Sequence, residues 1–166
     1  HVDSNPAWAC LLVTNKEDEE HDVTEPENDL DDTAAKGELS KYLSLFAWQD
    51  DDSDGIFDTQ NLEKPLPING DPDFDTRFHP SFFDVFFDID IADVGVGNPL
   101  PPTGPAATRH IGIAWCAGSQ DVDYQTGAIS CDGSSMSDWS QSDSFSADVV
   151  LYGEQYRNNP NFKCSE

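Results

Sequence analysis

Residues 82–91 read FFDVFFDIDI and alternate apolar with acidic residues along most of their length. In an extended chain, successive side chains point to opposite faces of the strand. One face of this segment is apolar and consists of Phe83, Val85, Phe87, Ile89 and Ile91, whereas the opposite face carries Asp84, Asp88 and Asp90. This period of two predicts a β-strand with one buried and one solvated face.

Other short segments show strand patterns, and they are Ala7–Thr14, Leu43–Trp48, Arg109–Cys116 and Ser144–Tyr152. The last two place apolar side chains on one face: Ile111, Ile113 and Trp115 in the first, and Phe145, Ala147, Val149 and Leu151 in the second. The segment Thr33–Leu43 predicts a short helix that Gly37 weakens.

Long polar connections join these segments. The acidic stretch 17–32 is expected to be a solvated loop, and residues 95–108 form a Pro/Gly-rich connection. Short strands with long connections and little helix predict a mainly β fold, namely a single antiparallel β-sandwich domain spanning residues 1–166.

The chain is strongly acidic, with 33 Asp and Glu against 8 Lys and Arg and a formal charge of −25. No basic patch is present to neutralise phosphates, which argues against a nucleic-acid partner and against a polybasic membrane anchor. No apolar run approaches the roughly 20 residues of a membrane-spanning helix. Ten Phe, four Trp and four Tyr argue for a folded protein with a core despite the charge.

Four cysteines are present: Cys10, Cys116, Cys131 and Cys164. None belongs to a CxxC pair, which disfavours a zinc knuckle or a thioredoxin-like motif. The even count favours disulfides and a secreted, extracellular or cell-surface location, although four allow three pairings and four free cytosolic thiols are the alternative. We favour Cys116–Cys131, which closes a short polar stretch, and Cys10–Cys164, which joins the two chain ends.

The stretch 50–58 (DDDSDGIFD) begins like a calcium-binding loop. Oxygen ligands at alternate positions curl around a hard cation, and a glycine at position 6, here Gly55, makes the sharp turn. The expected ligands are Asp50, Asp52, Asp54, the Ile56 carbonyl and Asp58. The usual glutamate at position 12 is replaced by Asn61, so Asp58, Glu63 or a distant carboxylate would have to close the site. The alternative is an acidic turn that binds only solvent.

Catalytic motifs are not found in the sequence. It contains neither HExxH nor a GxSxG nucleophile elbow, and no pair of carboxylates is singled out for glycoside hydrolysis. His110, at the head of a predicted strand, is expected to be structural or exposed. We therefore expect neither enzymatic activity nor a small-molecule substrate.

Several motifs resemble the TasA/camelysin-type secreted proteins, whose export depends on SipW-type signal peptides. These motifs are Asn5-Pro6-Ala7-Trp8-Ala9-Cys10, Ile113-Ala114-Trp115-Cys116, Cys131-Asp132-Gly133, Gln141-Ser142-Asp143-Ser144 and Arg157-Asn158-Asn159-Pro160-Asn161-Phe162-Lys163-Cys164. The resemblance covers most of the chain except about residues 64–108.

This resemblance implies a jelly-roll-like β-sandwich that polymerises with copies of itself into an extracellular filament of matrix or pilus type. It also implies donor-strand complementation, in which a strand of one subunit completes a sheet of the next. Two other functions stay open. One is a camelysin-like metalloprotease, and the other is a calcium-dependent carbohydrate-binding module that uses Trp48, Trp115 or Trp139 as a sugar platform.

Overall fold

The computed structural model describes residues 5–21, 36–58, 60, 63–66, 87–92, 97–102 and 108–164. This part of the chain is mainly β, and its strands pair antiparallel. Its helical segments are single 3₁₀ turns: η2 (Leu39–Tyr42), η6 (Gly133–Ser135), η7 (Asp138–Ser140) and η8 (Tyr156–Asn158). Among these described residues, no helix has the length and apolar character that crossing a membrane requires.

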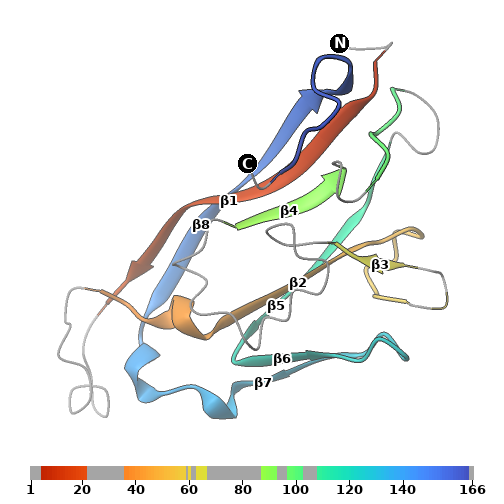
Figure 1. Cartoon of the computed structure of the whole chain (residues 1–166). Helices are drawn as coiled ribbons and strands as arrows, with labels where there is room; N and C mark the ends of the chain where they lie inside the picture. Colours follow the sequence, from red (N-terminus) through yellow and green to blue (C-terminus); the bar gives the residue numbers. More distant parts are fainter. Residues whose placement is uncertain are drawn as a thin grey trace.

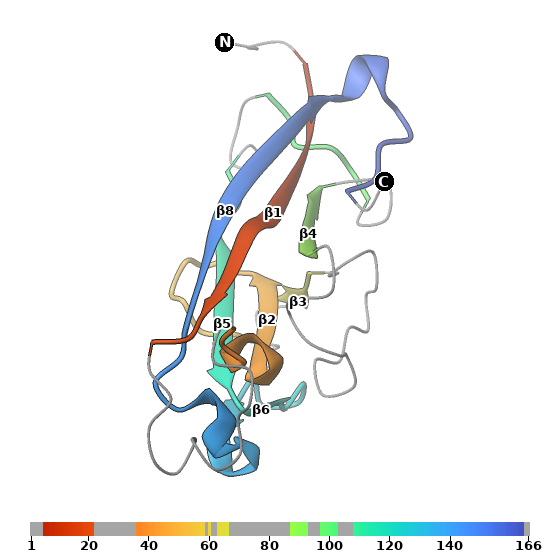
Figure 2. The ribbon, with the colours of Figure 1, turned by 90° about the vertical axis from the view of Figure 1, so that its left-hand side faces the viewer.

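Two three-stranded sheets form the body of the protein (Figure 1). The first has the order β4-β1-β8 and contains β4 (Phe87–Ala92), β1 (Ala7–Glu19) and β8 (Ser144–Gln155). The second has the order β3-β2-β5 and contains β3 (Lys64–Pro65), β2 (Leu43–Gln49) and β5 (Ile111–Ala117). In Figure 2, β8 and β5 lie along the same side of the molecule, whereas β4 and β3 lie along the other.

The two sheets pack face to face around a small apolar core. Val13 and Ile89 from the first sheet meet Ala47 from the second, together with Leu66 next to β3. The alternation predicted for residues 82–91 therefore places Ile89 and Ile91 in buried positions, as expected.

A second core lies on the other face of the second sheet. Phe46, Trp48 and Phe57 form it, and Val122 and Ile129 of the hairpin β6 (Ser119–Val122)–β7 (Ile129–Asp132) pack against it. The Trp48 ring lies so close to Gly112 that a Cβ on that residue would come within 2.0 Å of it. The second sheet thus contributes to a hydrophobic cluster on each of its two faces.

Both disulfides favoured from the sequence are present. Cys10–Cys164 joins β1 to the C-terminal tail over a separation of 154 residues, and Cys116–Cys131 joins β5 to β7 over 15 residues. The tail also packs through Trp8, whose indole Nε1 donates a hydrogen bond of 2.7 Å to the Asn159 carbonyl. Each disulfide therefore fixes a connection between elements that are already in contact.

The predicted boundaries need three corrections. β1 continues to Glu19, so residues 17–19 of the predicted acidic loop are strand, because they pair with residues 144–146 of β8. The helix expected over Thr33–Leu43 is only the 3₁₀ turn η2, and the strand expected from Arg109 begins at Ile111.

Several expectations concern residues outside the described part of the chain, namely most of the acidic stretch 17–32, residues 82–86 of the alternating segment and parts of the connection 95–108. The jelly-roll connectivity stays a prediction.

Candidate functional site: an apolar cleft and two acidic clusters

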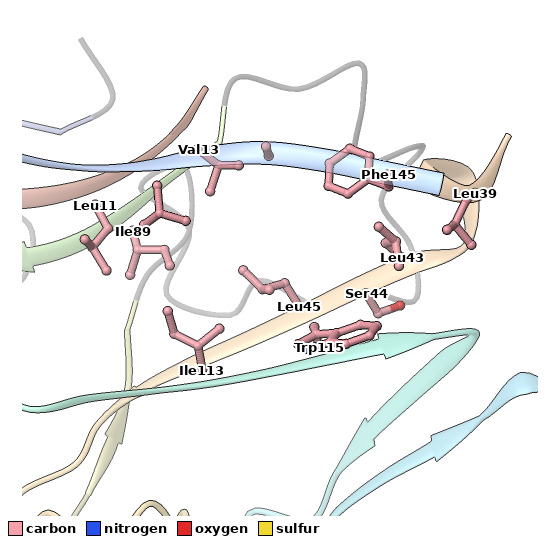
Figure 3. A pocket seen from close by; sticks show the side chains of 12 residues that line it. Leu11, Val13, Leu39, Leu43, Ser44, Leu45, Ile89, Ile113, Trp115 and Phe145 are labelled. Carbon is pink, nitrogen blue, oxygen red and sulfur yellow. The ribbon is translucent and has the colours of Figure 1, made fainter. Parts of the chain in front are cut away.

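An apolar cleft of about 400 Å³ lies between the two sheets, and residues of both β8 and β5 contribute to its lining. Its lining comes from both sheets and from η2, and consists of Leu11, Val13, Leu39, Leu43, Ser44, Leu45, Ile89, Ile113, Trp115, Phe145, Ala147 and Val149. In Figure 3, side chains of the two sheets face one another across this space. None of the lining residues is charged, and the Ser44 hydroxyl donates to the Gly118 carbonyl at 2.9 Å.

The apolar faces predicted for β5 and β8 are directed toward this cleft but are not buried. Trp115 is 70 % exposed and Val149 is 63 % exposed, while Leu151, two residues further along β8, is 69 % exposed. The sequence correctly grouped these side chains on shared faces. However, the two sheets cover those faces only in part, and large apolar side chains gathered at an open cleft are typical of an interaction site.

Both strands that border the cleft are edge strands in the part of the chain that the structure describes. There β8 pairs with β1 alone, and β5 pairs with β2 alone. An edge strand has a row of backbone N–H and C=O groups that another extended segment can pair with. The cleft therefore combines an apolar floor with two strand edges able to accept a further strand.

The predicted calcium loop follows β2, and its first carboxylate is directed inward. Asp50 is buried, and its two carboxylate oxygens accept hydrogen bonds from the N–H groups of Ser53 (2.7 Å) and Gly55 (3.1 Å). Glu63 is also buried and accepts from the N–H groups of Asp51 (3.0 Å) and Asp58 (2.7 Å). Gly55 has a φ of +77°, a left-handed conformation that favours glycine.

The loop brings together a subset of the predicted ligands. Carboxylate oxygens of Asp50, Asp52 and Glu63 lie within 4.8 Å of one another, so Glu63, one of the closing residues considered from the sequence, belongs to the group. Asp54 and Asp58 instead accept hydrogen bonds from the N–H groups of Ile56 (2.8 Å) and Gln60 (2.7 Å). An all-oxygen donor set suits a hard cation such as Ca²⁺.

A second acidic cluster, not anticipated from the sequence, joins Glu20, Glu38 and Asp143, whose carboxylate oxygens also lie within 4.8 Å of one another. Its members follow β1, precede η2 and precede β8, respectively. Because 105 residues separate Glu38 from Asp143, no local motif could have revealed the cluster.

Carboxylate side chains also accept hydrogen bonds from the backbone N–H groups at the start of η2. Asp143 accepts hydrogen bonds from the N–H groups of Glu38 (2.5 Å) and Leu39 (3.1 Å), and Asp18 accepts from that of Ser40 (3.2 Å). Burial raises the pKa of Asp18 above its usual value of 3.8, and the negative charge of Asp143 adds to the shift.

The two histidines in the described part of the chain lie next to the acidic clusters but belong to neither of them. Nε2 of His21 lies 2.7 Å from the Ser144 hydroxyl, and His110 is exposed and contacts Ser53. Neither acidic cluster in the described part of the chain includes a histidine.

Comparison with known proteins gives no relative: no family model, curated protein or solved structure matches this chain. The fold and the geometry therefore define a mainly β, disulfide-linked protein with an open apolar cleft between its sheets.

Proposed function

We propose that this protein is a structural subunit of an extracellular filament, in which a strand from one copy enters the apolar cleft of the next. The observation that carries the proposal is the cleft between β8 and β5, where exposed apolar side chains and two strand edges occur together. The two disulfides fit a secreted protein, since such bonds persist in oxidising compartments.

The occupant of the cleft is a strand with apolar residues at alternate positions. Strand addition satisfies the edge N–H and C=O groups, while alternate side chains enter the apolar space. This contact joins two different surfaces of the subunit, so it can be repeated from copy to copy, and it produces a filament when the rotation between copies does not close a ring.

A second copy of this chain is the occupant that we favour. Each copy has a formal charge of −25, so contact between copies is favourable only where it buries few carboxylates. The cleft meets this condition, since its lining contains no charged residue. The chain's own alternating apolar segments have the pattern that the cleft requires.

Calcium at the Asp50–Asp58 loop is part of the same proposal. Asp50, Asp52 and Glu63 are the residues that would hold the ion. A bound ion would offset the repulsion between these carboxylates and stabilise the folded subunit by mass action.

The two alternatives have less support. Trp48 is buried, so it is not available as a sugar platform, whereas Trp115 and Trp139 are exposed. Trp115 lines an apolar cleft with Ser44 as its one polar neighbour in the lining, which offers few of the polar groups that sugar recognition requires. A zinc protease normally uses histidine ligands, and both described acidic clusters are composed of carboxylates alone.

The test is negative-stain electron microscopy and sedimentation of the purified protein over a range of concentrations. The expected result is filaments whose amount increases with concentration. A monodisperse monomer at all concentrations, with or without calcium, would overturn the proposal.

Val149→Lys and Val150→Lys form a matched pair for this test. Both valines are exposed and adjacent in β8, but they lie on opposite faces, and Val149 lines the cleft. Val149→Lys is expected to abolish filaments because it places a charge in the apolar cleft, while Val150→Lys should preserve them. Equal effects of the two substitutions would show that the cleft is not the contact.

A further inference from the structure

The directions of the backbone groups in β1 show which of its residues bond to β8. Ala7 lies between Gln155 of β8 and Leu100. Its N–H donates to the Leu100 carbonyl at 3.0 Å and its carbonyl accepts the Leu100 N–H at 2.8 Å, so neither group is directed toward β8. In an antiparallel pair, residues whose backbone groups bond to the partner alternate with residues whose groups are directed away from it. Trp8 and every second residue after it therefore bond to β8.

The same alternation identifies the free edge of β8. The even-numbered residues from Val150 to Glu154 lie opposite the β1 residues that bond to β8. Tyr156 agrees with this assignment, because its N–H donates to the Pro6 carbonyl at 3.1 Å. The odd-numbered residues Val149, Leu151 and Gly153 therefore direct their N–H and C=O groups away from β1.

This edge of β8 lacks the usual protection of an edge strand. β8 is the outer strand of the first sheet (Figure 2). The side chains of Val149 and Leu151 are 63 % and 69 % exposed, and Gly153 is exposed as well. Proteins normally protect an edge strand with proline, charged residues or a β-bulge. Residues 149–153 contain neither proline nor charge, and their pairing with β1 is continuous, so the edge is open to strand addition.

The edge of β5 is shorter and is partly occupied. The Gly118 N–H donates to the Tyr42 carbonyl at 2.7 Å, so the odd-numbered residues of β5, from Ile111 to Ala117, direct their backbone groups to its free edge. At the end of this edge, Sγ of Cys131 lies 3.8 Å from the Ala117 carbonyl oxygen. The hairpin β6–β7 therefore occupies the space beside Ala117, and only the earlier part of β5 is left for pairing.

We propose that the incoming strand of the second copy pairs with β8, through the backbone groups of Val149, Leu151 and Gly153, and not with β5. This inference rests on the proposed filament and identifies the edge at which its subunits join. Alternate side chains of the added strand would enter the cleft beside Val149. Asp148 and Glu154 flank the stretch, so the incoming segment carries no acidic residue opposite them, because like charges that face each other destabilise a sheet.

Proline substitution tests which edge is used. An edge strand tolerates proline where the N–H is directed outward, and the substitution removes the donor that an added strand needs. Leu151→Pro and Ile113→Pro remove such a donor from β8 and β5, respectively. The matched controls Leu151→Ala and Ile113→Ala shorten the same side chains but keep the N–H.

Sedimentation gives the lowest protein concentration at which each variant forms filaments. Leu151→Pro should raise this concentration at least about tenfold above that of Leu151→Ala, because a carbonyl of the incoming strand loses its donor. Ile113→Pro and Ile113→Ala should differ by less than about twofold, because this N–H would have no partner in the filament.

Hydrogen exchange of the wild-type protein gives a measurement that needs no variant. The amides of Val149, Leu151 and Gly153 should exchange rapidly in free subunits and at least about 100-fold more slowly in filaments, because strand addition gives them partners. The amide of Val150 bonds to β1 and should be protected in both states. If Leu151→Pro fails to fold, this exchange pattern decides the question.

Two results would overturn the assignment to β8 while leaving the filament itself established. One is protection of Ile113 and Trp115 in place of the three β8 amides. The other is equal assembly of folded Leu151→Pro and Leu151→Ala. Absence of filaments from the wild-type protein would instead overturn the proposed function on which the assignment rests.

Discussion

Removing the disulfide between Cys10 and Cys164 should destabilise the protein more than removing the one between Cys116 and Cys131. The first bond closes a loop of 154 residues and the second a loop of 15. In the chain-entropy model, a cross-link stabilises the folded state by restricting the unfolded chain, and its effect grows with the logarithm of loop length. These lengths give about 5 kcal/mol for the long loop and about 3 kcal/mol for the short one.

The variants are the double substitutions Cys10→Ala/Cys164→Ala and Cys116→Ala/Cys131→Ala. Alanine avoids placing a hydroxyl group at buried positions such as Cys10. The tail should stay docked without its disulfide, because Trp8 bonds to Asn159 and the Tyr152 and Phe162 rings stack 5.9 Å apart. The loss of stability should therefore arise mainly in the unfolded state.

The assay is urea unfolding followed by tryptophan fluorescence, since urea does not screen the charges of this acidic chain as guanidinium would. With an m-value of about 2 kcal/mol per M, the midpoint should fall by about 2.5 M for the long loop and about 1.5 M for the short one. The m-value should also rise more for the long loop, because that unfolded chain becomes less compact. An equal or larger loss from the short loop, with unchanged m-values, would refute the reasoning.

Three further predictions concern pH, packing and metal. Burial raises the pKa of Asp18, so its ionised form destabilises the fold at pH 7 and protonation relieves this as the pH falls. In EDTA at pH 7, the Asp18→Asn variant should have a higher melting temperature than the wild type. This difference should vanish once the pH falls below the ordinary aspartate pKa of about 3.9. Gly112→Ala should cost about 1–3 kcal/mol in urea unfolding because its Cβ meets the Trp48 ring, while Gly153→Ala, with only an ordinary contact at 3.8 Å, should be tolerated. EDTA should lower the melting temperature of the calcium-loaded protein by about 3–6 °C at tenfold saturation, and an unchanged melt would contradict calcium binding.

Local patterns in the sequence predicted the strands and the faces that their side chains share. The alternation Phe145, Ala147, Val149, Leu151 predicted one face of β8 correctly, because a side-chain period of two is a property of the extended backbone itself. The Cys116–Cys131 disulfide was also within reach of sequence reasoning, since the two residues bracket a short polar stretch.

The end of β1 was predicted wrongly because it depends on residues far away in the sequence. The acidic residues 17–19 looked like a solvated loop, but pairing with residues 144–146 extends β1 through them. Pairing with β8 thus extended the strand into a segment whose acidic composition favours a loop. The local composition could not predict this, because it contains no information about the partner strand.

By itself, the sequence determined the mainly β class, the acidic character of the chain and the Asp-rich turn at residues 50–58. Each of these depends on residues that are neighbours in the chain. Only the tertiary structure decided that Val149 and Trp115 stay exposed at a cleft, and that Glu38 meets Asp143 across 105 residues. Burial and proximity depend on how the sheets are placed against each other. That placement is fixed by the sum of many distant contacts and not by any one segment.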